Sequence, residues 1–202
     1  MITTPGWDWP DRRDIVTSTS SEKPSTARLH RLADAIPYVA ALVFILLGSY
    51  RLYFPGIQYD EALFIQPALG AEETLFLHHH WNGIPIMLME YIGALKAWIY
   101  APIFHFFGVS PFTVRFPMIL VSAATLLVLC RFIRRESGPA AAAFLAILLA
   151  VDPAFIFHTR LDWGPFALRM FLKSAAILLW FRFVRSPSLG TLLGVGLLLG
   201  IG

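Results

Sequence analysis

The sequence predicts an all-α integral membrane protein, built as a polytopic bundle of helices. Of its 202 residues, 57% are hydrophobic and only 14% are charged, and the mean hydropathy is +0.65. A soluble domain carries about a quarter charged residues, so this chain has too few charges to cover a globular surface. The composition therefore excludes a soluble domain, a disordered chain, collagen and a coiled coil. The single cysteine, Cys130, excludes an internal disulfide and a thiolate metal cluster.

Successive apolar stretches give the expected spans. A span needs about 20 mostly apolar residues. The first covers residues 36–54, and its far end carries the aromatic residues Tyr50, Tyr53 and Phe54, which are typical of a headgroup boundary. Three more follow at 109–130, 140–157 and 166–184. A fifth, at 189–202, is still apolar where the sequence stops, so we expect a truncated span and a longer protein, of which this is the N-terminal part.

Connections rich in basic residues alternate along the chain with a connection that is mostly acidic. Residues 1–34 and the connections after the second and fourth spans are rich in arginine, whereas residues 55–108 carry Lys96 alone against five acidic residues. Basic loops stay in the cytoplasm, so we expect a cytoplasmic N-terminus in the plasma (inner) membrane, with 55–108 outside. The polar segment 1–34 is expected to be a disordered tail, and 35–202 the transmembrane domain.

The outer loop at 55–108 is too long and too apolar for a plain connection. Asp60 is expected to cap a short helix over 61–68 that Gly70 ends. Apolar residues then recur with helical spacing from Leu88 to Ile103, but Lys96 and other polar residues interrupt them. We therefore expect helices that lie in the membrane interface rather than a further span.

The acidic pair Asp60-Glu61 is the first candidate for chemistry. A carboxylate at the outer surface can take a proton from a hydroxyl nucleophile, as a general base does. The same pair is equally compatible with a helix N-cap and a favourable acidic residue in the first turn. The residues alone do not choose between these interpretations.

Basic residues near the outer face form the second candidate group. Arg115 either reaches phosphate headgroups, or orients a carboxylate or phosphate. Arg169 and Lys173 share one face of a predicted span, where each cation costs about 2.5–3.5 kcal/mol. Either a bound lipid phosphate compensates that cost, or an ion pair with Asp152 or Asp162 does. Asp162 is also compatible with a simple N-cap.

The run His78-His79-His80 suggests a metal site, but three consecutive side chains cannot all point one way. Glu72 and Glu73 are near in sequence only. We expect no metal site here and interpret the run as a polar interface loop.

Three short motifs, in this order and on these sides of the membrane, resemble a known family. They are Tyr59-Asp60-Glu61-Ala62, Val114-Arg115-Phe116-Pro117 ahead of a helix ending in basic residues, and the outer stretch His158-Thr159-Arg160-Leu161-Asp162. The arrangement resembles the GT-C superfamily of membrane glycosyltransferases. It is most similar to the group, like glycosyltransferase family 39, of the dolichyl-phosphate-mannose protein mannosyltransferases and the related bacterial lipid A aminoarabinose and galacturonic acid transferases. The likeness covers about residues 36–185.

The resemblance implies transfer of a sugar from a polyprenyl-phosphate carrier to an acceptor hydroxyl at the outer membrane face, with inversion. By this likeness Asp60 is the general base, supported by Glu61, Arg115 steadies the acidic site, and Asp162 lines the same cavity. Arg160, Arg169 and Lys173 neutralise the departing lipid phosphate. No metal or other cofactor is implied. The implied partners are membrane lipids, the sugar donor and a protein, lipid or polysaccharide acceptor, with no nucleic acid. Trp163-Gly164-Pro165 matches no particular subgroup.

Other functions stay open at this point. One is a non-enzymatic polytopic membrane subunit or a transporter fragment, although the sequence shows no internal repeat of the kind transporters have. Another is a polymerase that uses a diphosphate carrier and a metal. We favour the transferase because the candidate charges gather toward the outer face, and we expect this segment alone to be inactive.

Overall fold

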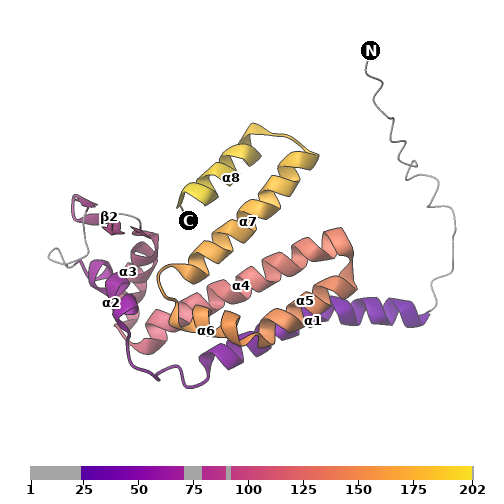
Figure 1. Ribbon diagram of the computed structural model, residues 1–202, viewed down its shortest axis with the longest axis horizontal. Coiled ribbons are helices and arrows are strands. Elements are labelled where there is room, and N and C mark those ends of the chain that lie inside the picture. The colour runs from indigo at the N-terminus through magenta and orange to yellow at the C-terminus, as the bar shows by residue number, and fades with distance from the viewer. Residues whose placement is uncertain (1–23, 71–78, 90–91, 202) are drawn as a thin grey trace, which may run out of the picture.

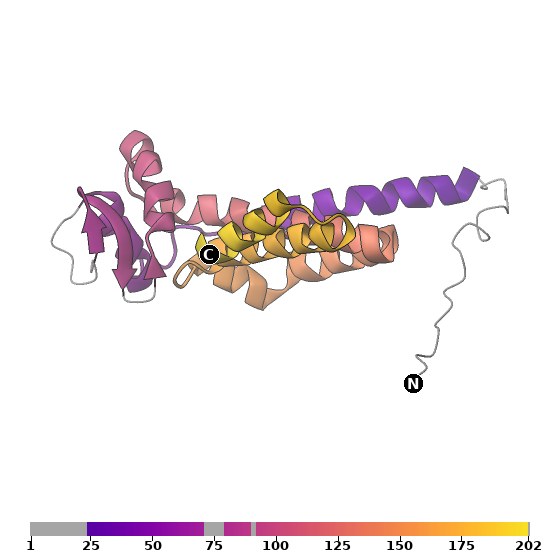
Figure 2. The ribbon, with the colours of Figure 1, turned by 90° about the horizontal axis from the view of Figure 1, so that it is seen from above.

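The structure of the chain is a computed structural model that describes residues 24–70, 79–89 and 92–201. Within them, helices form an elongated bundle, and a small group of short elements lies at one of its ends (Figure 1). The same arrangement is seen from above in Figure 2, where the strands and α3 lie beyond the end of the bundle opposite the start of α1. This confirms the predicted all-α membrane class, with one addition, a three-stranded sheet.

The bundle contains two long helices and four shorter ones. They are α1 (Pro24–Ser49), α4 (Pro111–Ser137), α5 (Pro139–Val151), α6 (Pro153–Leu161), α7 (Phe166–Arg185) and α8 (Leu189–Ile201). The side chain of Ser110 caps α4 by accepting from the backbone N–H of Thr113 at 3.2 Å. Gly138, at φ +90°, ends α4 and lets α5 begin at once with a proline. Asp152 caps α6 through the N–H groups of Ala154 and Phe155.

Two helices, α1 over Leu32–Ser49 and α4, are long and apolar enough to cross a membrane. A third crossing is possible if α5 and α6, which meet at an angle of 59°, count as one span. The predicted span at 140–157 is therefore two helices broken at Asp152. The predicted span at 166–184 is helical as α7, which carries Arg169, Lys173 and Arg182 and is therefore not among the helices that length and composition alone identify as spans.

The bounds of helix α1 differ from those of the first predicted span at both ends. Helix α1 begins at Pro24, so the last part of the segment expected to be disordered, 24–34, is helical, and residues 1–23 lie outside the description. The helix ends at Ser49, so Tyr50, Tyr53 and Phe54 lie in the following turn rather than on the helix. Arg51, at φ +50°, has the left-handed backbone that breaks a helix.

The group at the end of the bundle corresponds to the predicted outer loop. It contains α2 (Tyr59–Ala68), the strands β1 (His79–Trp81), β2 (Ile84–Met89) and β3 (Ile92–Gly93), and α3 (Leu95–Phe107). The helix expected from Leu88 therefore begins only at Leu95. Asn82-Gly83 joins β1 to β2 with positive φ at both residues, as a two-residue hairpin turn requires. The Asn-Gly dipeptide is the sequence signal for this hairpin. The helical spacing of apolar residues from Leu88 favoured a helix instead, so the hairpin was not predicted.

Two clusters of buried side chains hold these parts together. The first joins α1, α4, α5 and α6, and Phe44 and Leu126 are fully buried in it. The second joins α2, α3, β2, the beginning of α4 and the beginning of α7, with Phe64 and Tyr100 fully buried. The Tyr100 hydroxyl donates to the carbonyl of Val114 at 2.7 Å, which fixes α3 on α4. The second cluster forms the floor under the candidate site.

Candidate active site

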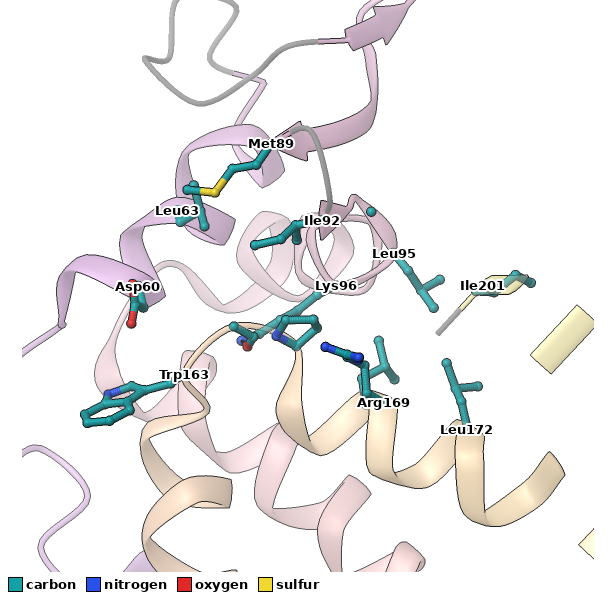
Figure 3. Close-up of a pocket in the computed structure, with 14 residues that line it drawn as sticks. Asp60, Leu63, Met89, Ile92, Leu95, Lys96, Trp163, Arg169, Leu172 and Ile201 are labelled. Carbon is teal, nitrogen blue, oxygen red and sulfur yellow. Dashed lines mark hydrogen bonds between the residues drawn. The ribbon is translucent and has the colours of Figure 1, made fainter. Parts of the chain in front are cut away.

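A pocket of about 470 Å³ opens where α2, α3 and the beginning of α7 meet. Figure 3 shows Asp60 of α2 on one side of it and Arg169 of α7 on the other. Polar atoms contribute about as much of its surface as apolar ones, although most of the residues that line it have apolar side chains: Asp60, Leu63, Met89, Ile92, Gly93, Leu95, Lys96, Trp163, Gly164, Pro165, Leu168, Arg169, Leu172 and Ile201. Apolar side chains around a few convergent polar groups are the usual lining of a small-molecule site.

Asp60 presents a carboxylate to this pocket. It lies in the first turn of α2, and the N-cap of that helix is Gln58, so the predicted capping role of Asp60 was wrong. The side chain is half-buried. Within the described residues it has neither an ion-pair nor a hydrogen-bond partner, and it is therefore available to a bound molecule. Asp60 and Glu61 both lie in the first turn of α2, as the interpretation of a favourable acidic first turn expects, and the general-base role of Asp60 stays a prediction that its place in the pocket allows.

Glu61, the next residue, points away into the protein and is almost completely buried, with 1% of its surface exposed. Arg115 of α4 meets it in a two-pronged ion pair, with Nε 2.6 Å from Oε1 and Nη2 2.9 Å from Oε2. Glu61 Oε2 also accepts from the backbone N–H of Gln58 at 2.8 Å. Glu61 therefore locks α2 onto α4 and holds the neighbouring Asp60 at the pocket.

The three N–H groups of Arg115 that remain donate to backbone carbonyls. Nη1 donates to Leu52 at 2.6 Å and Pro55 at 2.8 Å, and Nη2 donates to Gly56 at 2.9 Å. An arginine has five N–H donors, so all of them are used inside the protein. Arg115 therefore reaches neither lipid headgroups nor a substrate phosphate in this structure, and it steadies the acidic site instead.

Arg160 holds the same turn from another helix. Its Nη2 donates to the carbonyl of Phe54 at 2.7 Å and to that of Arg51. It lies in α6 rather than in the outer turn expected for it, and it does not line the pocket. Arginines of α4 and α6 thus fix the turn at 51–56, through which the chain passes from α1 to Asp60.

Lys96 and Asp162 form a second buried ion pair, next to the pocket. Lys96 Nζ lies 2.6 Å from Asp162 Oδ2, and the exposed fractions of the side chains are 1% and 4%. Asp162 Oδ1 accepts from the backbone N–H of Ala167 at 2.8 Å, so this carboxylate also satisfies the first turn of α7. Asp162 itself does not line the cavity, contrary to expectation, whereas Lys96 does.

Sequence reasoning missed the role of Lys96. Its Nζ also donates to the carbonyls of Gly164 at 2.9 Å and Asp162 at 3.3 Å, and it lies 4.2 Å from the centre of the Phe64 ring. Burial lowers the pKa of Lys96 below its usual 10.5, against the opposing attraction of Asp162. The available signal was that Lys96 is the only basic residue in 55–108 and lies among apolar residues with helical spacing.

Arg169 and Lys173 lie on exposed positions of α7, and neither has an ion-pair partner within the part of the chain that the structure describes. The ion pair with Asp152 or Asp162, one of the two alternatives for these cations, is therefore absent there, since Asp152 caps α6 and Asp162 binds Lys96. Arg169 lines the pocket and Lys173 does not.

The histidine run lies partly outside the description. His79 and His80 are exposed residues of β1, and His78 is not described. Among the described residues, no group of three or more histidine, cysteine or acidic side chains is placed to hold a metal ion.

The pocket thus combines a carboxylate and a guanidinium, neither with an ion-pair partner in the part of the chain that the structure describes, with mostly apolar side chains, and two buried ion pairs hold the elements around it. A family model of the dolichyl-phosphate-mannose-protein mannosyltransferases matches residues 93–202, more than half of the chain. The matched region contains Lys96, Arg115, Asp162 and Arg169, and Asp60 precedes it. No curated protein and no solved structure matches the chain. The chain belongs to the dolichyl-phosphate-mannose-protein mannosyltransferase family of GT-C-type membrane glycosyltransferases.

Proposed function

We propose that this pocket transfers a sugar from a polyprenyl-phosphate carrier to an acceptor hydroxyl, at the outer face of the membrane and with inversion. The observation that carries the proposal is the pair of charges on its two sides, Asp60 and Arg169, neither of which has an ion-pair partner among the described residues. The other charged residue that lines the pocket, Lys96, is paired with Asp162, so within the described part of the lining these two groups are the ones free to act on a substrate.

In the proposed reaction, the acceptor oxygen attacks the anomeric carbon of the sugar while its proton passes to the Asp60 carboxylate. The bond between that carbon and the phosphate oxygen breaks, and the polyprenyl phosphate leaves with the bonding electrons. Because the attack comes from the face opposite the leaving phosphate, one displacement inverts the anomeric carbon. Phosphate is a good leaving group in this step when a cation stabilises it, so no separate acid is needed.

Arg169 is the proposed partner of the leaving phosphate. A guanidinium can donate two parallel N–H bonds to phosphate oxygens, and such bonds are strongest where water is excluded. Leu168, Leu172 and Ile201 make the wall apolar on this side, which suits the beginning of a polyprenyl chain. Lys173 lies one turn further along α7, and we propose that it attracts the phosphate towards Arg169.

The two buried ion pairs have a supporting role in the proposal. Glu61 and Arg115 set the position of α2, and Lys96 and Asp162 set that of the loop before α7. We assign Arg160 to the same supporting role rather than to the phosphate, because its guanidinium holds the turn at 51–56. No metal or other cofactor enters the proposed step.

The charges at the two ends of the bundle support action at the outer face. The pocket lies at one end, where α2 and α3 are found, and Arg131, Arg134, Arg135, Arg182 and Arg185 lie at the opposite ends of α4 and α7. Basic ends of helices stay in the cytoplasm, which would place the N-terminus there and the pocket outside.

The test is transfer of radiolabelled mannose from polyprenyl-phosphate mannose, with membranes of a strain that lacks the native gene and carries the full-length protein. We expect Asp60→Asn to abolish transfer without changing the amount of protein in the membrane. Asp34→Asn is the matched control, because Asp34 is paired with Arg134 at the other end of the bundle. We expect Arg169→Gln to raise the KM for the donor, and Lys173→Gln to raise it less.

Two results would contradict this proposal. Normal transfer by Asp60→Asn would remove the assigned base. An unchanged donor KM in Arg169→Gln would leave the leaving phosphate without the assigned partner.

A further inference from the structure

Trp163 lies in the pocket wall and has no role in the reaction proposed above. Half of its surface is exposed, at 50%. In Figure 3 it lies below Asp60, at the side of the pocket away from Leu172 and Ile201. A large aromatic side chain that stays half exposed beside the assigned base is available for contact with a bound molecule.

The backbone around Trp163 is fixed on both sides. Asp162 and Gly164 both have left-handed backbones, at φ +43° and +69°, which turns the chain sharply between α6 and α7. Lys96 Nζ binds the carbonyl of each of these two residues, as well as the Asp162 carboxylate. One buried cation therefore holds the residues before and after Trp163 and sets the place from which the indole projects.

The indole ring is also held by aromatic neighbours. Its centroid lies 5.7 Å from that of Phe157 and 6.1 Å from that of His158, and the ring planes are nearly perpendicular, at 80° and 77°. His158 packs in turn on Phe166 at 5.4 Å. A ring fixed in this way loses little conformational entropy when a ligand binds to the surface that remains exposed.

The chemistry of the exposed surface suits a sugar ring. The face of an aromatic ring carries partial negative charge, and it attracts groups with partial positive charge at their edges. A hexopyranose presents one such surface, formed by its ring C–H groups, while its hydroxyl groups point outward from the ring. With the sugar ring on the indole, its hydroxyl groups would lie towards the pocket, where the Asp60 carboxylate is an acceptor.

We propose that Trp163 is a stacking platform that binds a hexopyranose ring at the Asp60 side of the pocket. This inference rests on the proposed function, since it gives the sugar ring of that reaction its binding surface. The ring belongs either to the donor or to the acceptor, and the two differ in whether a lipid carrier is attached.

An exposed tryptophan is also a common membrane-interface anchor. An anchor affects insertion and stability in the membrane but not the affinity for a sugar. The position of Trp163 in the pocket wall, under Asp60, favours the stacking role over the anchoring role.

The kinetic test compares Trp163→Leu with Trp163→Phe in the transfer assay described above. An aromatic contact contributes about 0.5–1.5 kcal/mol, so Trp163→Leu is expected to raise the KM for the substrate that carries the ring about two- to tenfold, with little change in kcat. Trp163→Phe keeps an aromatic face and should stay within about twofold of the native KM. Trp180→Leu is the matched control, because Trp180 is similarly exposed at 46% and lies outside the pocket.

A binding test separates this inference from the proposed function. The full-length Asp60→Asn protein is labelled with 5-fluorotryptophan, and the resonance lost in Asp60→Asn/Trp163→Phe identifies Trp163. Polyprenyl-phosphate mannose, sugar-free polyprenyl phosphate and methyl mannopyranoside are then added in turn. If the Trp163 resonance shifts with polyprenyl-phosphate mannose but not with sugar-free polyprenyl phosphate, the bound ring belongs to the donor. If it shifts with methyl mannopyranoside, the ring belongs to the acceptor.

Each result decides one of the two proposals. If no sugar moves the Trp163 resonance and the KM of Trp163→Leu is native, the stacking role is wrong even when transfer depends on Asp60. If Asp60→Asn transfers mannose normally and a mannose-containing ligand shifts the Trp163 resonance, the stacking role stands and the assigned base is wrong. Loss of membrane insertion in Trp163→Leu, with native KM in Trp163→Phe and no shift, would indicate an anchor.

Discussion

Replacing Arg115 with methionine should destabilise the protein more than any other single change at the site. The substitution keeps an unbranched apolar side chain but removes all five hydrogen bonds that the guanidinium donates. Breaking a buried ion pair from one side costs about 3–5 kcal/mol, because the remaining charge is left without a partner. The Glu61 carboxylate, 1% exposed, would be that charge.

The size of the effect can be followed through Cys130. This is the single cysteine of the sequence and it is buried in the structure, so a thiol-reactive dye labels it only when the fold opens. For a chain of this size, about 1 kcal/mol shifts Tm by about 2–4 °C, so Arg115→Met should lower Tm by about 6–20 °C. Glu61→Gln should cost less, because glutamine retains an oxygen that can accept from Arg115.

A double-mutant cycle tests the cause of this effect. If the two side chains form one buried pair, the double variant Glu61→Gln/Arg115→Met should be more stable than the sum of the two single changes predicts. Additive effects, or a Tm of Arg115→Met within 2 °C of the native value, would refute the inference that this pair holds α2 on the bundle.

Three further predictions follow from the same contacts. Burial lowers the pKa of Lys96, so just below pH 10.5 the unfolded chain binds more protons than the folded one. The free energy of unfolding should therefore rise with pH in this range. Lys96→Met should flatten that rise, as measured by intrinsic-fluorescence melts. Gly83→Ala should speed hydrogen exchange in β1 and β2, because alanine at φ +77° costs about 1–2 kcal/mol, whereas Gly190→Ala should not. Arg160→Gln should lower the Tm, because the Arg160 guanidinium donates its hydrogen bonds, each of about 1.5–3 kcal/mol, to the protein itself. For the same reason the donor KM should stay within about twofold of native, in contrast to Arg169→Gln.

The membrane fold was largely predictable from the sequence. Apolar length locates α1 and α4, because the cost of leaving charges or backbone groups unpaired in lipid leaves few alternatives. The ends of these helices were less predictable. Apolar residues continue past Ser49 while the backbone turns at Arg51, and Asp152-Pro153 breaks one apolar stretch into α5 and α6. Composition alone does not record such changes of direction.

For the site, the sequence indicated residue types but not their partners. Asp60 and Arg169 line the pocket, and their chemical roles stay predictions. Arg115 orients a carboxylate, that of Glu61, which was one of the interpretations offered for it. Arg160 and Asp162 were expected to face the substrate, but they bind protein groups instead. The partners of Arg115 and Arg160 include backbone carbonyls, which every residue possesses and no sequence pattern marks. Lys96 and Asp162 are 66 positions apart, and local spacing does not pair residues over that distance.

The turn at 51–56 has a consequence for how this region tolerates change. Arg115 and Arg160 hold it through the carbonyls of Arg51, Leu52, Phe54, Pro55 and Gly56, and thus through main-chain atoms. Most amino acids offer the same carbonyl, provided that the backbone path is kept. Mutational drift at exposed side chains such as that of Tyr53 can therefore proceed while the Asp60 carboxylate stays in place. A change at either arginine has no such freedom, since each secures several main-chain atoms at once.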